Sequence, residues 1–372
     1  MKLNVVDAES LLKFNNFVKK ISSIELLRFI SSLMVLFWHY QQFYLPYNFF
    51  SNKEIYFNDK SNQPFFEYLS IFYNYGNLGV NFFFLISGFV FSYVYLGIEK
   101  KTSLKKFVVN RVARLYPLHI FTLFVVLFSQ FYCQLNFNEY LIYKNNDLYH
   151  FFLNIFFISG WGFEKGPSFN GPIWSVSIEI IIYFLFFFIM IYKKKNLILK
   201  SVFLILILLI IRKLNAIFSD NFFININLVI CGILFFTGNL IYLIFNYSYP
   251  KIILILFSLI LILISVLGNF KSFIFLPAIL ILALSLEDIL SKKIKKIFNF
   301  LGNLSYGIYL WHTPLQIILI LFIKENEKDF ILIDNNFFFL FYIFVVFFVS
   351  VLSYYFFEEK IRKKIRSLNQ LK

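Results

Sequence analysis

Long apolar segments recur along the whole chain and are separated by short polar stretches. A helix needs about 20 apolar residues to cross a hydrocarbon core, and ten segments approach that length. They lie at residues 24–45, 76–98, 112–132, 173–192, 197–211, 226–246, 251–267, 272–289, 303–323 and 335–357. The pattern predicts an all-α protein, a polytopic transmembrane bundle of about ten spans. The apolar stretch 150–160 is too short to span, and is expected either in the interface or as a re-entrant segment.

The positions of lysine and arginine predict how the spans are oriented. An even number of spans puts both termini on one side, and the segments of that side carry 26 of the 35 basic residues. The opposite loops carry the other 9, beside 11 of the 20 acids. By the positive-inside rule, both termini are predicted to be cytoplasmic. We expect a single membrane domain over residues 1–372, with a cytoplasmic segment at 1–23 and a basic cytoplasmic tail at 358–372.

The composition supports a membrane protein and excludes several other classes. The chain is 60% hydrophobic and only 15% charged, so one soluble core could not hide its apolar surface. The net charge of +15 follows from membrane topology and requires no nucleic-acid partner. Two cysteines and four histidines show no spacing typical of a metal site, and they predict neither a disulfide framework nor a metal. The sequence does not determine the oligomeric state.

The first apolar segment contains three ionisable residues. Glu25 and Arg28 lie one helical turn apart near its beginning, and His39 lies near its end. At about 1.5 Å of rise per residue, Arg28 and His39 are about 16 Å apart along one helix. Ionisable groups inside a membrane are costly, and they therefore mark functional candidates.

Glu179 is predicted to lie at the depth of His39. The fourth span runs in the opposite direction to the first, which places Glu179 about 10 Å from its outer edge. A carboxylate can orient an imidazole and stabilise its protonated form, which is the arrangement of a general base. The alternative is a neutral histidine that is hydrogen-bonded for packing. We interpret His39 and Glu179 as a catalytic pair.

Arg111 and Arg114 are one turn apart at the start of the third span, and Arg28 is expected at the same face. A guanidinium group binds a phosphate through two parallel hydrogen bonds, which suits a phosphorylated substrate from the cytosol. The alternative is that Arg111 and Arg114 only anchor the protein at the cytoplasmic face, as the positive-inside rule describes. This alternative explains Arg28 less well, because Arg28 lies within a helix.

Other polar residues in the spans are weaker candidates. Ser87 could be an acylated nucleophile, although with Gly79 and Gly88 beside it a role in close helix packing is the safer interpretation. His312 lies about 15 Å from the inner edge of its span, before Pro314, and could line the same cavity as His39. His119 and His150 lack a comparable partner and are interpreted as structural.

At these residues the chain resembles the acyltransferase-3 family, integral-membrane acyltransferases of bacteria. The resemblance covers nearly the whole chain, and it is carried by the order and spacing of several motifs rather than by any one of them. They are Glu25, Arg28 and His39, then GVNFFFLISGF at 79–89, the arginine pair with Leu-Tyr-Pro at 111–117, WSVSIE with Tyr183 at 174–183, GNLSYGIYLWHTPL at 302–315, and FFEEK near the end. Trp174, Ser177 and Tyr306 become site candidates through these motifs. The chain departs from the pattern at Asn81, where an acid is frequent.

The resemblance implies a function and a location. Such an enzyme would sit in the bacterial inner membrane and move an acyl group, most often acetyl, from cytoplasmic acetyl-CoA or another acyl-CoA to a hydroxyl of a cell-surface polysaccharide. The acceptor would be a glycan or a lipid-linked glycan, for example the O-antigen of lipopolysaccharide, a capsule or an exopolysaccharide. Membrane lipids would be the other partners. His39 would either deprotonate the acceptor or carry the acyl group. A transporter or flippase of a lipid-linked saccharide is the alternative, because buried charges also mark transport pathways.

Overall fold

The computed structural model describes residues 20–44, 61–97, 102–192, 194–217, 225–245, 249–268, 271–326 and 330–368. These residues form helices and short connections, without a strand among them. The longer helices are α2 (Ser22–His39), α4 (Phe66–Tyr75), α5 (Leu78–Tyr95), α6 (Leu104–Phe137), α8 (Trp174–Phe186), α9 (Leu197–Ile217), α10 (Ile226–Phe245), α11 (Lys251–Leu267), α12 (Leu276–Leu286), α13 (Lys292–Glu325), α14 (Asn336–Ser353) and α15 (Glu359–Leu368). The all-α prediction is confirmed for this part of the chain.

Each of the ten predicted spans corresponds to a helix. Seven helical stretches in the described residues are long and apolar enough to cross a membrane. They are Leu78–Tyr95, Leu104–Phe137, Gly171–Ile191, Ile226–Phe245, Ser272–Ile289, Lys292–Glu325 and Asn336–Leu368. The other three predicted spans correspond to α2, α9 and α11, and α11 is apolar but only 17 residues long. The protein is a multi-pass membrane protein, and the count of ten stays a prediction.

The helices differ from the expected bounds at two places that matter for the site. Helix α6 begins at Leu104, eight residues before the predicted span, so Arg111, Arg114 and Pro117 all lie inside it. The predicted tail begins in a helix, because α15 follows α14 through a π-helical turn at Tyr354–Glu358, and its cytoplasmic location stays a prediction. Of the predicted terminal segments, residues 1–19 and 369–372 lie outside the described residues.

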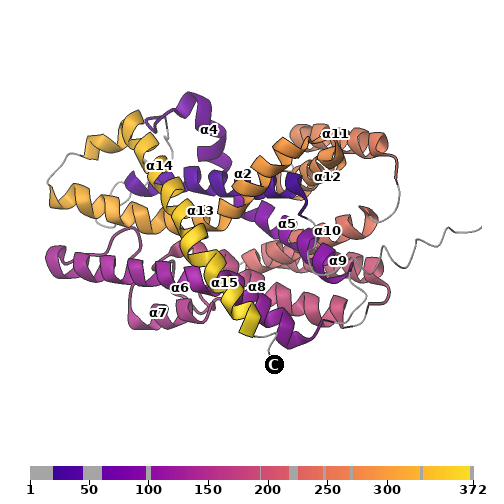
Figure 1. The fold of residues 1–372 in the computed structure, drawn as a ribbon, viewed down its shortest axis with the longest axis horizontal. Coiled ribbons are helices and arrows are strands. Elements are labelled where there is room, and N and C mark those ends of the chain that lie inside the picture. The colour runs from indigo at the N-terminus through magenta and orange to yellow at the C-terminus, as the bar shows by residue number, and fades with distance from the viewer. Residues whose placement is uncertain are drawn as a thin grey trace, which may run out of the picture.

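Helices α2 and α13 pack against each other at the centre of the bundle, where Figure 1 shows them with α14 and α15 crossing α13 and α6 diagonally. Gly302 is a point of close approach between α2 and α13. A Cβ atom there would lie 2.8 Å from the Cα atom of Glu25. Because α13 touches α2 at the level of Glu25, the next turns of α13 run alongside the functional face of α2.

Small residues also let α5 approach α10, as the sequence predicts for Gly88. A Cβ atom at Gly88 would lie 1.8 Å from the carbonyl oxygen of Phe235, and one at Gly238 would lie 2.0 Å from that of Leu85. The two backbones are therefore in direct contact, an arrangement that membrane helices reach only through such residues. Gly79 likewise allows α5 to approach the backbone of Ser31 on α2, so α5 lies between α2 and α10.

Candidate functional site

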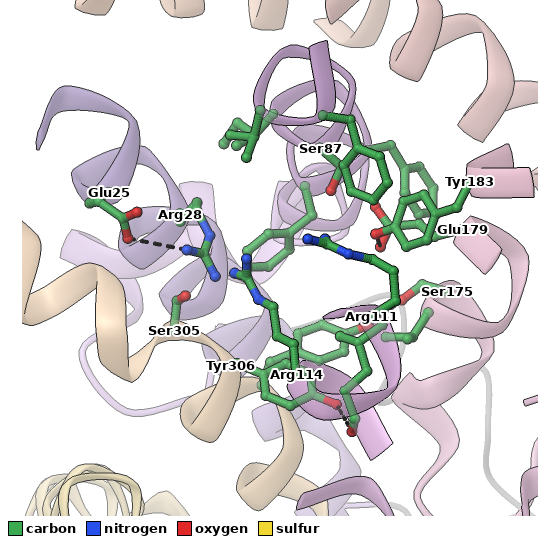
Figure 2. Close-up of a pocket in the computed structure, with 18 residues that line it drawn as sticks. Glu25, Arg28, Ser87, Arg111, Arg114, Ser175, Glu179, Tyr183, Ser305 and Tyr306 are labelled. Carbon is green, nitrogen blue, oxygen red and sulfur yellow. Dashed lines mark hydrogen bonds and ion pairs between the residues drawn. The ribbon is translucent and has the colours of Figure 1, made fainter. Parts of the chain in front are cut away.

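A cavity of about 120 Å³, called here the arginine pocket, lies where five helices meet. It is lined by Glu25, Arg28, Phe83, Phe84, Ile86, Ser87, Val90, Phe91, Arg111, Arg114, Leu115, Ser175, Val176, Glu179, Tyr183, Ser305, Tyr306 and Tyr309. The three predicted arginines come from α2 and α6, and Figure 2 shows their guanidinium groups pointing into a common space. The structure thus brings Arg28, Arg111 and Arg114 together, as expected from their predicted depth.

Arg28 is the only one of the three that pairs with an acid in the described part of the chain. Its Nη1 atom lies 3.1 Å from Oε2 of Glu25, one turn earlier on α2. Both side chains are mostly buried, with 16% and 13% of their surface exposed. Glu25, a candidate through its motif, therefore fixes the direction of Arg28, and it also packs against Gly302 of α13.

Arg111 is oriented by aromatic rings. Its guanidinium carbon lies 4.5 Å from the ring centroid of Phe91 and 5.9 Å from that of Tyr95, both on α5. The Nε atom is buried without a hydrogen-bond partner among the described residues. A guanidinium held by stacking keeps donors free for a ligand, which a guanidinium held by a carboxylate does not.

Glu179 also lines the arginine pocket, on the wall formed by α8. The hydroxyl of Tyr183, one turn later on that helix, donates to its Oε2 atom at 2.6 Å. The Oε1 atom is buried and has no hydrogen-bond partner in the described structure. One oxygen is thus held in place, and the other remains available inside the pocket.

A second pocket of about 100 Å³ adjoins the first and shares four of its residues. It is lined by Lys20, Glu25, Arg28, Arg114, Gly302, Asn303, Tyr306, Tyr354, Glu358 and Arg362. Lys20 and Arg362 come from near the two ends of the described chain, so both ends lie at the same end of the bundle. Their orientation toward the cytoplasm stays a prediction.

The electrostatics of the arginine pocket favour an anionic ligand. Three guanidiniums face one another beside only two carboxylates, and like charges in a site of low dielectric repel. An anionic ligand would relieve this repulsion and could accept a hydrogen bond from the unpartnered Nε atom of Arg111.

The predicted contact between His39 and Glu179 is wrong. The Nδ1 atom of His39 lies 2.9 Å from the carbonyl oxygen of Val35, and its ring faces His312, with ring centroids 4.8 Å apart. Glu179 is turned instead toward Tyr183 and the arginine pocket, which His39 does not line. Helical rise predicts the depth of a side chain along its helix, but the rotation of the helix about its axis depends on packing.

The remaining candidates separate into two groups. Ser87 and Tyr306 line the arginine pocket, and the Tyr306 hydroxyl donates to the carbonyl oxygen of Leu115 at 2.6 Å. Trp174 and Ser177 lie outside its lining. Trp174 packs edge-on against Phe84, and the Ser177 hydroxyl donates to the carbonyl oxygen of Phe157 at 2.7 Å. Their positions suit the packing of α8 against the loop before it.

Sequence reasoning missed three polar residues of the pocket wall, Ser175, Ser305 and Tyr309. The Tyr309 hydroxyl donates to the carbonyl oxygen of Pro172 and lies 2.7 Å from the hydroxyl of Ser175. A signal was present, because Ser305, Tyr309 and His312 follow at helical spacing along one face of α13. A polar stripe of this kind in an apolar helix marks a face that avoids lipid.

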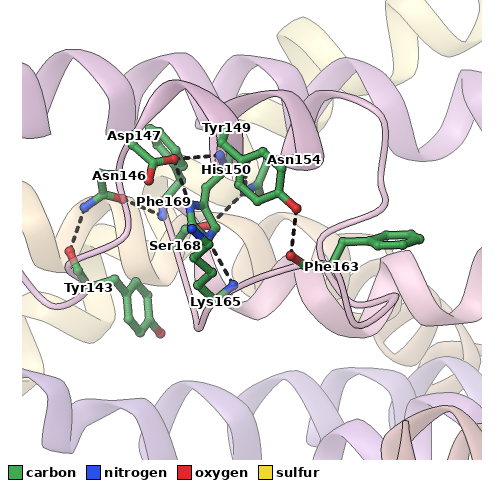
Figure 3. Close-up of polar contacts among 10 residues, drawn as sticks. All are labelled: Tyr143, Asn146, Asp147, Tyr149, His150, Asn154, Phe163, Lys165, Ser168 and Phe169. Atoms are coloured by element: carbon green, nitrogen blue, oxygen red, sulfur yellow. Dashed lines mark hydrogen bonds and ion pairs between the residues drawn. The ribbon is translucent and has the colours of Figure 1, made fainter. Parts of the chain in front are cut away.

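Figure 3 shows that His150 does have an acidic partner, which the sequence analysis overlooked. Its Nδ1 atom lies 2.7 Å from Oδ1 of Asp147, and its Nε2 atom accepts the backbone N–H of Lys165 at 3.1 Å. The backbone N–H and the imidazole of His150 both donate to Asp147, and these bonds lower the pKa of the Asp147 carboxyl. With both ring nitrogens occupied, His150 is structural, and it ties α7 (Leu148–Ile155) to the following loop.

His119 is also structural, as the sequence analysis predicts. Its Nε2 atom lies 2.8 Å from the carbonyl oxygen of Asn154, so it joins α6 to α7.

The sequence of the chain matches a known family model. Residues 21–355 match the model described as an acyltransferase domain, a stretch that includes every residue lining the arginine pocket. No curated protein and no solved structure matches the chain. The family model is therefore the comparison that connects the geometry with known proteins.

Proposed function

Because the chain belongs to the acyltransferase-3 family, we propose that it transfers an acyl group, most often acetyl, from acyl-CoA to a hydroxyl of a cell-surface glycan. The observation that carries this proposal is the arginine pocket, in which three guanidiniums from two helices face one buried space. Family membership favours transfer of an acyl group over the alternative of saccharide transport. The expected location is the bacterial inner membrane.

CoA would be bound through its phosphates. Arg28 and Arg114 line both pockets and Arg111 lines the inner one, so the phosphates would lie where the two pockets meet. The free Oε1 atom of Glu179 would accept a hydrogen bond from an amide N–H of the pantetheine arm. In this proposal Glu179 positions the donor, and it does not assist His39 directly.

The thioester would reach His39 past Tyr309. Tyr309 lines the arginine pocket, its ring lies 6.0 Å from that of His312 between centroids, and His312 faces His39. The arginines and the histidines are therefore connected through one face of α13. The acyl end of the donor would pass this wall while the CoA phosphates stay bound to the arginines.

His39 would act through its Nε2 atom. A carbonyl oxygen only accepts hydrogen bonds, so the contact with Val35 places the proton of the neutral ring on Nδ1 and leaves a lone pair on Nε2. In direct transfer, Nε2 takes the hydroxyl proton, the hydroxyl oxygen attacks the thioester carbon, the C–S bond breaks, and the proton goes to the thiolate. In the two-step route, Nε2 attacks the thioester carbon, the C–S bond breaks and CoA leaves as the thiolate. The glycan hydroxyl then attacks the acyl carbon, the bond to Nε2 breaks, and the hydroxyl proton goes to the thiolate.

Acetyl-CoA labelled in its acetyl group, incubated with the purified protein in nanodiscs and with deacylated surface glycan, tests the proposal. We expect labelled glycan with the wild type and none with His39→Ala. Equal labelling by both proteins would contradict the proposed role of His39. Label that stays on the protein after denaturation, together with ping-pong kinetics, would support the two-step route. Wild-type protein that transfers no label to any glycan fraction would overturn the proposed function.

A further inference from the structure

His39 and His312 form a buried pair of imidazoles between α2 and α13. Their ring centroids are 4.8 Å apart and their planes are tilted by 44°. His312 has no exposed surface, and 7% of His39 is exposed. Two titratable rings in contact inside a membrane protein are costly, because neither can be charged there without a partner.

The two rings have the same tautomer, as judged from their contacts. The Nδ1 atom of each lies near the carbonyl oxygen one turn earlier, Val35 at 2.9 Å for His39 and Ile308 at 3.2 Å for His312. Because these oxygens can only accept, Nδ1 carries the proton and Nε2 carries a lone pair in both neutral rings. The Nε2 atom of His312 is buried and has no hydrogen-bond partner in the described part of the protein.

The backbone around the pair is fixed by side chains from the same region. Gln316 Nε2 donates to the carbonyl oxygen of His39 at 2.8 Å, and the Tyr342 hydroxyl donates to that of His312 at 3.1 Å. Tyr309 and Tyr342 are the titratable side chains with contacts to the pair from α13 and α14. Among the described residues, no carboxylate, lysine or arginine forms a hydrogen bond or ion pair with either ring.

We propose that His312 is the proton partner of His39 and takes the part that the sequence suggested for Glu179. When His39 receives the hydroxyl proton on Nε2, the new N–H is shared in a three-centre hydrogen bond between the attacking oxygen and the lone pair on Nε2 of His312. The positive charge is then shared between two rings, and the proton returns through His39 to the thiolate after the C–S bond breaks. His312 gains no proton over the whole reaction. It acts through His39 and is therefore a positioning residue.

This inference rests on the proposed function for its chemistry, but the pairing can be tested by substitution. In His312→Gln, the side-chain amide takes the place of Nε2, and its oxygen can still accept from His39. In His312→Asn, the amide takes the place of Nδ1 and can still bond the carbonyl oxygen of Ile308. A purely structural role through Nδ1 would be preserved better by asparagine, whereas a role through Nε2 would be preserved better by glutamine.

We expect kcat to fall about 100-fold in His312→Asn and about 10-fold in His312→Gln, within the range that general-base catalysis contributes. The donor KM should stay unchanged in both, because the arginine pocket is intact. His150→Gln, which replaces a buried histidine outside both the pair and the arginine pocket, is the matched control and should keep its kcat. Equal activity of the glutamine and asparagine variants, or greater activity of the asparagine variant, would overturn the proposal.

A second measurement does not depend on acyl transfer. The chain has four histidines, so protein labelled with ¹⁵N in its imidazole rings gives few signals. If one proton is shared, the Nε2 signals of His39 and His312 should shift together in one step as the pH is lowered. Signals that shift at two unrelated pH values would refute the pairing. Should the wild type transfer no acyl group, a joint shift would still support the pair while the proposed function fails.

Discussion

Arg111 offers a test of the arginine pocket because the chain contains a matched control for it. The guanidinium carbon of Arg111 lies 4.5 Å from the ring centroid of Phe91, and that of Arg212 on α9 lies 4.5 Å from the ring centroid of Phe273. Both arginines lose the same kind of cation–π contact on replacement by glutamine. Only Arg111 lines the pocket, so only its replacement should affect the donor.

The expected magnitude follows from the contacts. A hydrogen bond between charged groups contributes about 1.5–3 kcal/mol, and each 1.4 kcal/mol is about tenfold in affinity. Arg111→Gln should therefore weaken CoA binding about 10- to 100-fold. The cation–π contact contributes about 0.5–1 kcal/mol to folding at an exposed site and about 2 kcal/mol at a desolvated one, so the half-buried Arg111 should lose at least as much stability as the exposed Arg212.

Calorimetric titration of CoA into purified protein in nanodiscs measures the affinity without an acceptor, and thermal unfolding of the same samples reports their stability. We expect weak CoA binding only in Arg111→Gln, with a small drop in melting temperature for both variants that is no larger in Arg212→Gln. The reasoning is refuted if Arg111→Gln binds CoA within twofold of the wild type, or if Arg212→Gln loses as much affinity. In the first case Arg111 would be a topological anchor.

Three further predictions concern His39, the α5–α10 contact and the His150 network. His39→Ala should insert and fold normally, because one polar group leaves the membrane, while acyl groups disappear from the surface glycan, as read by mass spectrometry of its repeats. Gly88→Ala places a methyl group against the backbone of Phe235 and should lower the free energy of unfolding by about 1–3 kcal/mol or more. In Gly232→Ala the nearest atom to the methyl group is the flexible end of a leucine, so the loss should be smaller. The hydrogen bonds that lower the pKa of Asp147 stabilise the loop at pH values above the ordinary carboxyl pKa, and this stabilisation is lost as the pH falls through the lowered pKa. Protease cleavage in residues 156–170 should therefore increase in acid. Asp147→Asn should remove that pH dependence.

Much of the fold could be predicted because membrane helices have a strong signal. Each predicted span matched a helix, since apolar length is set by the membrane and backbone groups inside it must be hydrogen-bonded within their own helix. The bounds were less accurate where a helix continues past the apolar segment, as α6 does at its beginning. There the extra residues 104–111 mix polar with apolar side chains, and α6 packs against α15.

Part of the site could also be predicted. Arg28, Arg111 and Arg114 were expected at one end of the bundle, and they do line one pocket, because rise per residue and span direction together give the depth of a side chain. Ser305 and Tyr309 escaped notice, since a single serine or tyrosine in a helix carries little information until its neighbours along the same face are considered.

The sequence by itself determined which segments are helical, which end of the bundle is basic, and how deep each charged side chain lies along its helix. Only the tertiary structure decided that His39 faces His312 and that Glu179 faces the arginines. The reason is that depth depends on position along one helix, whereas facing depends on the rotation of two helices about their axes. That rotation is set by contacts such as Gly302 against Glu25, which join residues 277 positions apart and which no local pattern contains.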